Sequence, residues 1–249
     1  MMKRHNKGHI AFISIDDGAS ASKPPYLDRD GERPSDNCSR IAWDLAEQGW
    51  YVDLFAHQSE PPVQDDHPRY RKIFLPISLD GDIDNILDAL EAAAQAFLRY
   101  QETQGILYPI IHTHCWASAW VGARIKQHQF VRLVHTACGA SLSTAVESVS
   151  DRHPAAIERQ CLEAVDCLVV ADPPTKVAFG ENGRHQDSPG MTPQTAIPGI
   201  ISASKIHQLS PHMALADQLD GVYREQLDLL CHQFFFASPL PMSSQQAVV

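Results

Sequence analysis

Short, continuous runs of apolar residues recur along the chain and alternate with segments of helical periodicity. Each run is four to seven residues long, which is typical of a strand that is buried on both faces. The strands predicted in this way are 9–15, 51–56, 71–77, 107–112, 131–136, 167–171 and 195–198. Because such strands need cover on both sides, the pattern predicts a mostly parallel sheet between two layers of helices.

The segments between these runs predict the helices. Ser35 or Asp36 can cap a helix that ends at Gly49, and apolar residues from Ile83 to Leu98 recur at helical spacing. Further helices are predicted at 116–126 and 155–165, with a short one opening at Pro173. The fold class expected is α/β: one doubly wound, Rossmann-like sheet followed by a long C-terminal helix over 211–236. We expect 1–201 to form the domain, 202–236 a linker and a helix packing back on it, and 237–249 a flexible tail.

The residues that could bind a ligand are expected directly after the strands, because parallel sheets bind ligands beyond the carboxyl ends of their strands. Asp16-Asp17-Gly18 follows the first strand, His112-Thr-His-Cys-Trp116 the strand at 107–112, His135-Thr-Ala-Cys-Gly139 the next, and Asp172 the one after. The stretch 19–34 is long for a connection, and such loops are usually functional or mobile.

Three interpretations of the histidines remain open. In the first, His114, one residue past its strand, lines a polar small-molecule pocket. In the second, five residues bind zinc, although their spacing matches no recognised pattern; they are His112, His114, Cys115, His135 and Cys138. In the third, His112 and His135 are core or capping residues whose ring nitrogens bond the nearby backbone.

Composition and motifs narrow the class of function. The 249 residues carry a formal charge of −10, which argues against a nucleic-acid binder. The absence of an 18-residue apolar run and of a signal peptide predicts a soluble, cytoplasmic protein, and the six cysteines are expected to be reduced and mostly buried. Walker A, G-x-S-x-G, H-E-x-x-H and G-x-G-x-x-G motifs are all missing.

Five segments, in order, resemble the N-terminal domain of the family 4 retaining glycosyltransferases, which have the GT-B fold. The resemblance is greatest to the sucrose synthase and sucrose-phosphate synthase-like branch. The segments are 42–55, 111–122, 133–136, 159–174 and 196–200. The second, Ile-His-Thr-His-Cys-Trp-Ala-Ser-Ala-Trp-Val-Gly, is close to the family's "IHAHYWDAGWVG".

The resemblance implies a site at these loops. His114 falls on the family's active-site histidine, which lies near the transferred sugar. Substrate-binding positions would be Asp17, Gly18, Gly31, Cys115, Trp116, Thr136, Cys138 and Gly139. The family's glycine pair falls near Glu32-Arg33, and a second histidine is replaced by Cys138. A sugar nucleotide would be the donor substrate, and no cofactor or metal is implied.

The family's second, donor-binding domain has no counterpart after Ile201. The leading hypothesis is therefore a non-catalytic binding or regulatory module, or one half of a split glycosyltransferase, that takes a sugar or sugar-phosphate ligand. The alternatives are an active transferase completed by a donor-domain partner chain or a homo-oligomer, and a scaffold that interacts through helix 211–236. On any of these readings 249 residues are too few for a complete enzyme of the family.

Overall fold

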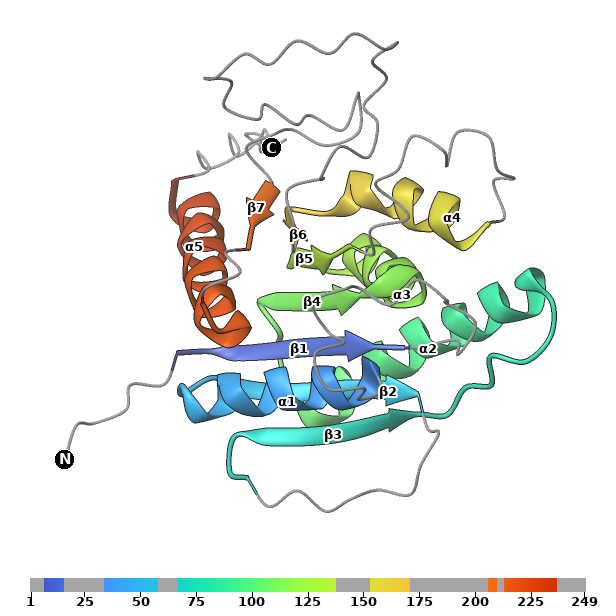
Figure 1. Cartoon of the computed structure of the whole chain (residues 1–249), viewed down its shortest axis with the longest axis horizontal. Coiled ribbons are helices and arrows are strands. Elements are labelled where there is room, and N and C mark those ends of the chain that lie inside the picture. Colours follow the sequence, from blue (N-terminus) through green and yellow to red (C-terminus); the bar gives the residue numbers. More distant parts are fainter. Residues whose placement is uncertain are drawn as a thin grey trace, which may run out of the picture.

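One parallel sheet organises the molecule (Figure 1). The computed structural model describes residues 7–15, 34–57, 67–137, 153–170, 206–209 and 213–236. Within them the strands are β1 (His9–Ser14), β2 (Tyr51–His57), β3 (Tyr70–Leu75), β4 (Ile110–His114), β5 (Arg132–Thr136), β6 (Cys167–Val170) and β7 (Ile206–Gln208). Their order is β3-β2-β1-β4-β5-β6-β7, and all six pairings are parallel. The α/β fold class predicted from the sequence is confirmed.

Helices cover both faces of this sheet. α1 (Pro34–Glu47) and α5 (Leu215–Phe236) pack on one face, and α2 (Ile83–Gln104), α3 (Cys115–His128) and α4 (Pro154–Cys161) on the other. A 3₁₀ turn (Leu162–Ala164) continues α4. Each face has its own apolar core, so the strands are buried on both sides as their continuous apolar runs predict.

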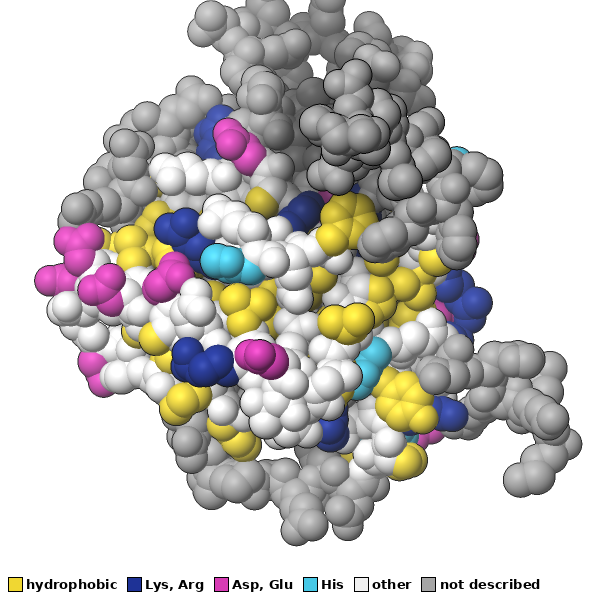
Figure 2. Space-filling view, turned by 180° about the vertical axis from the view of Figure 1, so that it is seen from behind, with side chains coloured by type: hydrophobic (Ala, Val, Ile, Leu, Met, Phe, Trp, Pro, Cys, Tyr) yellow, Lys and Arg dark blue, Asp and Glu magenta, His cyan; other side chains and the backbone are white. Residues whose placement is uncertain are grey.

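Figure 2 shows the molecule from behind, so that the face covered by α2, α3 and α4 is toward the viewer. Its acidic side chains gather at one side, around the start of α2, where Asp80, Asp82 and Asp84 are exposed. Asp82 caps α2 by accepting a hydrogen bond from the amide of Asn85 at 3.0 Å, and Gly105 ends the helix with a φ of 63°. Both ends of the longest predicted helix on this face therefore follow ordinary capping chemistry.

The strand predicted at 107–112 is observed as β4, which begins three residues later and ends two residues later. Leu107 is 82% exposed, whereas β4 continues through the polar residues His112, Thr113 and His114. The strand tolerates these side chains because neighbouring side chains hydrogen-bond His112 and Thr113. The expectation that His114 lies one residue past the strand is therefore wrong, because His114 is its last residue.

The sheet also extends beyond residue 201. The short strand β7 pairs with β6 and was not predicted, because Ile-His-Gln has too few apolar residues to show a pattern. The predicted strand 195–198, the helix at Pro173 and the residue Asp172 lie outside the described residues. Of the described cysteines, Cys38, Cys161 and Cys167 are buried, Cys115 is partly exposed and Cys231 is exposed.

The C-terminal helix α5 is part of the core. Leu219, Val222 and Tyr223 are buried among residues of α1 and the sheet. Asp220 accepts hydrogen bonds from Lys7 Nζ and Trp50 Nε1, both at 2.8 Å. The apolar side of α5 thus stabilises the domain itself. None of the helices in the described segments has the length and apolar character that crossing a membrane requires.

Candidate functional site at the carboxyl ends of the strands

The ends of three central strands lie in one row. Ser14 of β1 pairs with His114 of β4, which pairs in turn with Thr136 of β5. The strand order changes direction between β1 and β4: β2 and β3 follow on one side of β1, and β4 to β7 follow on the other. Such a switch point is where open α/β sheets usually bind ligands.

His114 is the buried residue of this row that lacks a complete set of hydrogen bonds. Its side chain is 4% exposed, and its Nδ1 lies 3.2 Å from Cys115 Sγ. Its Nε2 is buried without a hydrogen-bond partner among the described residues. A buried polar atom without a partner costs about 1–3 kcal/mol, so a group from outside the described residues, such as a water or a ligand, would stabilise His114 Nε2 by bonding to it.

His114 is neutral at physiological pH. Burial, with a smaller contribution from nearby His135, lowers the pKa of His114 to about 3. A neutral imidazole has one N–H donor and one acceptor nitrogen. It can therefore bind a hydroxyl or phosphate oxygen, but it is not a source of protons at neutral pH.

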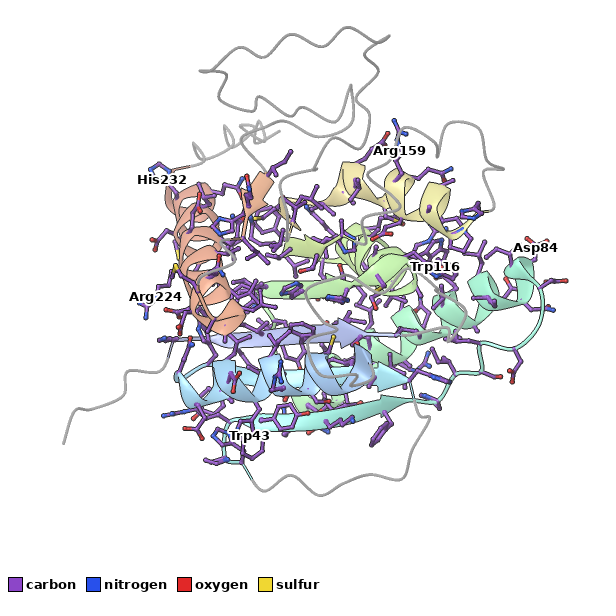
Figure 3. The ribbon with its side chains drawn as sticks, viewed as in Figure 1. Trp43, Asp84, Trp116, Arg159, Arg224 and His232 are labelled. Carbon is purple, nitrogen blue, oxygen red and sulfur yellow. The ribbon has the colours of Figure 1, made fainter. Side chains whose placement is uncertain are left out.

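The chain turns from β4 into α3 at Cys115 without an intervening loop. Cys115 has a φ of 63°, in the left-handed region that residues other than glycine rarely adopt. Trp116 follows in the first turn of α3 (Figure 3) and is 3% exposed, inside the core on the α2–α4 face. Ser118 Oγ accepts a hydrogen bond from the amide of Ile15 at 2.8 Å, which fixes the end of β1 against α3.

His112 is a core residue with both ring nitrogens occupied. Nδ1 hydrogen-bonds Tyr223 Oη of α5, and Nε2 lies 2.8 Å from Thr136 Oγ1. Burial, together with His114 and His135, lowers its pKa well below the usual value. The core interpretation applies to His112, although its partners are side chains and not the backbone atoms that the sequence suggested.

His135 is also a core residue, but it faces the opposite side of the sheet. Its Nε2 donates to Glu158 Oε1 of α4 at 2.8 Å, and Thr113 Oγ1 lies 2.9 Å from its Nδ1. The three histidines are thus neighbours in the sheet, divided between its two faces. The described residues include no group of three His, Cys, Asp or Glu side chains that could hold a metal ion.

Four of the nine predicted site residues lie close along the backbone, at the ends of β4 and β5 and the start of α3: His114, Cys115, Trp116 and Thr136. The side chain of Trp116 is buried in the core on the α2–α4 face. Asp17, Gly18, Gly31, Cys138 and Gly139 lie outside the described residues, as do Glu32 and Arg33. A ligand-binding role remains a prediction for all nine residues.

Sequence reasoning missed the residues that hold the site in place. Ser118, Glu158 and Tyr223 each hydrogen-bond a strand end or one of the core histidines. Glu158 and Tyr223 stand in amphipathic helices, where the sequence signal is a polar group on the apolar side of the helix. Their partners are up to 111 residues distant along the chain, so the pairs emerge only from the fold.

The comparisons with known proteins agree with this fold. The family model described as "Glycosyl transferase 4-like domain" matches residues 37–187, and the chain belongs to that family. Comparison with curated proteins gives no match.

Solved structures of sucrose-phosphate synthase from Thermosynechococcus elongatus are among the similar ones. One has a TM-score of 0.56 and 21% identity over 88% of this chain and 99% of that chain. A second has a TM-score of 0.49 and 26% identity over 67% of this chain. The chain spans 43% of the length of that second structure. The first likeness supports the fold, a Rossmann-like α/β domain.

Proposed function

We propose that this chain is the sugar-binding half of a glycosyltransferase-like protein, and that it does not transfer a glycosyl group by itself. The sugar or sugar phosphate would bind at the carboxyl ends of β1, β4 and β5. The observation that carries this proposal is His114 Nε2, which is buried at the strand ends without a partner in the described part of the chain. A sugar hydroxyl can act as donor or acceptor, so it suits either tautomer of the neutral ring.

The geometry of the strand ends supports a binding role for His114. The side chain is held at the last position of a central strand, and Ser118 anchors the neighbouring strand end. A ring that is already fixed loses little entropy when a ligand binds. Its depressed pKa favours hydrogen bonding over proton donation.

Transfer from a sugar nucleotide would need a second domain to hold the nucleotide. All strands of the described residues belong to one sheet, and the resemblance assigns donor binding to a separate Rossmann-like domain. We infer that this domain belongs to a partner chain, to a second copy, or to a further segment of the same protein.

Calorimetric titration with sugars and sugar phosphates tests the binding role. We expect at least one ligand to bind, and His114→Ala to weaken it by about tenfold, which corresponds to one lost hydrogen bond. His128→Ala is the matched control, because His128 is exposed at the other end of α3. Equal affinities for the two variants would reject the role of His114.

Nucleotide release from UDP-, ADP- and GDP-sugars tests the absence of transfer. We expect no turnover by the isolated chain with candidate acceptors. Turnover that His114→Ala removes would instead establish an active transferase, and recovery of a second Rossmann-like protein in a pull-down would identify its donor-binding partner.

A further inference from the structure

A cavity of about 530 Å³ lies at the opposite edge of the sheet, where β1, β2 and β3 begin. In Figure 1 this is the left-hand end of these strands. The side chains that matter there are His9, Tyr51, Asp53, Arg69 and Arg71. The volume falls in the range of about 300–1,000 Å³ that small-molecule sites occupy. β1 separates this edge from His114 by roughly 16 Å, at about 3.3 Å per residue.

The single carboxylate of this group is already saturated. Asp53 is 1% exposed and accepts from Arg71 Nε at 2.7 Å, from Arg71 Nη2 at 2.5 Å and from the Tyr108 hydroxyl. His9 Nε2 lies 3.1 Å from its Oδ2. Burial alone would raise the pKa of Asp53, but these contacts outweigh burial and lower it. Asp53 therefore stays ionised and has little capacity left to accept a further donor.

The two arginines keep donors that face the cavity. Arg71 uses Nε and Nη2 for Asp53, and its Nη1 donors have no hydrogen-bond partner in the part of the chain that the structure describes. Arg69 has its guanidinium 5.7 Å from the centre of the Tyr51 ring and no acidic partner within the described segments. Among the residues that line the cavity, the two arginines carry two positive charges and Asp53 one negative charge. The lining therefore has one excess positive charge, although the formal charge of the chain is −10.

Arg69 is also fixed by its backbone. Its amide donates to His67 Nδ1 at 3.2 Å, and its carbonyl oxygen accepts from the amide of Val52 at 2.8 Å. The next residue, Tyr70, begins β3 and is buried. The base of the Arg69 side chain is therefore held in place before any ligand arrives, which reduces the entropy lost on binding.

We propose that this cavity binds a small organic anion, with a phosphate or carboxylate group between Arg69 and Arg71 and its carbon skeleton over Tyr51. Planar guanidinium groups match the geometry of both oxyanions and bind them through paired hydrogen bonds. Tyr51 is 36% exposed, with the Arg69 guanidinium 5.7 Å and the His9 ring 5.8 Å from its ring centre, so its exposed part can contact the carbon skeleton beside them. The site is independent of the function proposed for His114, because the two lie at opposite edges of the sheet.

Calorimetric titration of the whole chain with glycerol 3-phosphate and with succinate tests the proposal and distinguishes the two oxyanions. We expect one of them to bind, and Arg69→Ala to weaken it by about tenfold or more. Arg69→Lys, which keeps the charge but loses the planar fork, should lie between Arg69→Ala and the wild type. Lys72→Ala is the matched control, since it removes the same charge from β3 outside the cavity and should bind like the wild type.

Two further variants locate the bound anion. His114→Ala should leave this binding unchanged, whatever it does to sugar binding. Thermal unfolding of Arg69→Ala establishes that the variant is folded, and Arg69→Gln repeats the test with more of the side-chain stem retained. Failure of both ligands to bind the wild type, or equal affinities for Arg69→Ala and Lys72→Ala, would overturn the proposal.

Discussion

The two edges of the sheet, where the strands begin and where they end, differ in whether their buried polar groups have hydrogen-bond partners. At the amino edge, the buried Asp53 carboxylate meets donors from His9, Arg71 and Tyr108. At the carboxyl edge, His114 Nε2 has no such partner among the described residues. A saturated group is explained by stability alone, whereas an unsaturated one costs free energy that a ligand can recover. The contrast separates the saturated Asp53 group, a structural clamp between β2, β3 and Tyr108, from His114, a candidate binding residue.

The largest expected effect comes from breaking the clamp. Asp53→Ala leaves the Tyr108 hydroxyl buried without its acceptor and removes the counter-charge of Arg71. The Arg71 side chain is 47% exposed, so water can solvate its charge, and the main cost is the unsatisfied Tyr108 hydroxyl. A buried group left without its partner costs about 1–3 kcal/mol, so we expect a loss of that size in the free energy of unfolding. Urea unfolding at neutral pH measures it.

The matched control is Asp84→Ala, because Asp84 is exposed in the first turn of α2 (Figure 3). We expect this variant to lose less than about 1 kcal/mol, the usual contribution of a charge near a helix end. If Asp53→Ala were no worse than Asp84→Ala, the amino edge would not be a clamp, and the contrast between the two edges would fail.

Acid should destabilise the carboxyl edge before the amino edge. An unfolded histidine titrates near pH 6.5, whereas burial lowers the pKa of His114 to about 3 in the folded chain. The stability that this residue contributes is thus complete above pH 6.5 and is lost as the pH falls toward 3. The pKa of Asp53 is lowered below 3.8, so its contribution is lost only as the pH falls below about 4.

The variant His114→Asn isolates the contribution of His114 to the pH dependence of the free energy of unfolding. Each unit of pH below 6.5 should cost the wild type about 1.4 kcal/mol more than the variant, or about 2 kcal/mol at pH 5. Urea unfolding at pH 7.5, 6.5, 5.5 and 5.0 measures the difference in slope. Parallel slopes for the two proteins would mean that His114 is solvated in the folded state and is not buried at the end of β4.

Much of the fold was accessible from the sequence, and the reasons are local. Continuous apolar runs predict β1, β2 and β5 within two residues of their observed limits, because buried parallel strands need such runs. β4 was misplaced and β7 missed, since their ends consist of polar residues that only tertiary partners make tolerable. Periodicity detects burial in an apolar core and gives no signal for a hydrogen bond between distant side chains.

The candidate site was predictable only in part. The sequence places His112, His114 and His135 near one another, because parallel strands end together. It does not show that His112 and His135 point to opposite faces and bond Tyr223 and Glu158. Asp53 stands inside an apolar strand, which is a visible signal, but its partners in β3 and before β4 are 18 and 55 residues away along the chain.

The smallest effect concerns the backbone of the carboxyl edge, at Cys115. With a φ of 63°, a non-glycine residue costs about 1 kcal/mol relative to glycine, which adopts this conformation freely. Cys115→Gly and Cys115→Ala both remove the thiol that lies 3.2 Å from His114 Nδ1, so their difference measures the backbone strain less the extra entropy that glycine loses on folding. We expect the glycine variant to be more stable by about 1 kcal/mol in urea unfolding. Equal stabilities would show that the backbone at the turn from β4 into α3 relaxes once the thiol is removed. The strain would then depend on the contact between Cys115 and His114. In that case the two edges would differ only in the unsatisfied Nε2 of His114.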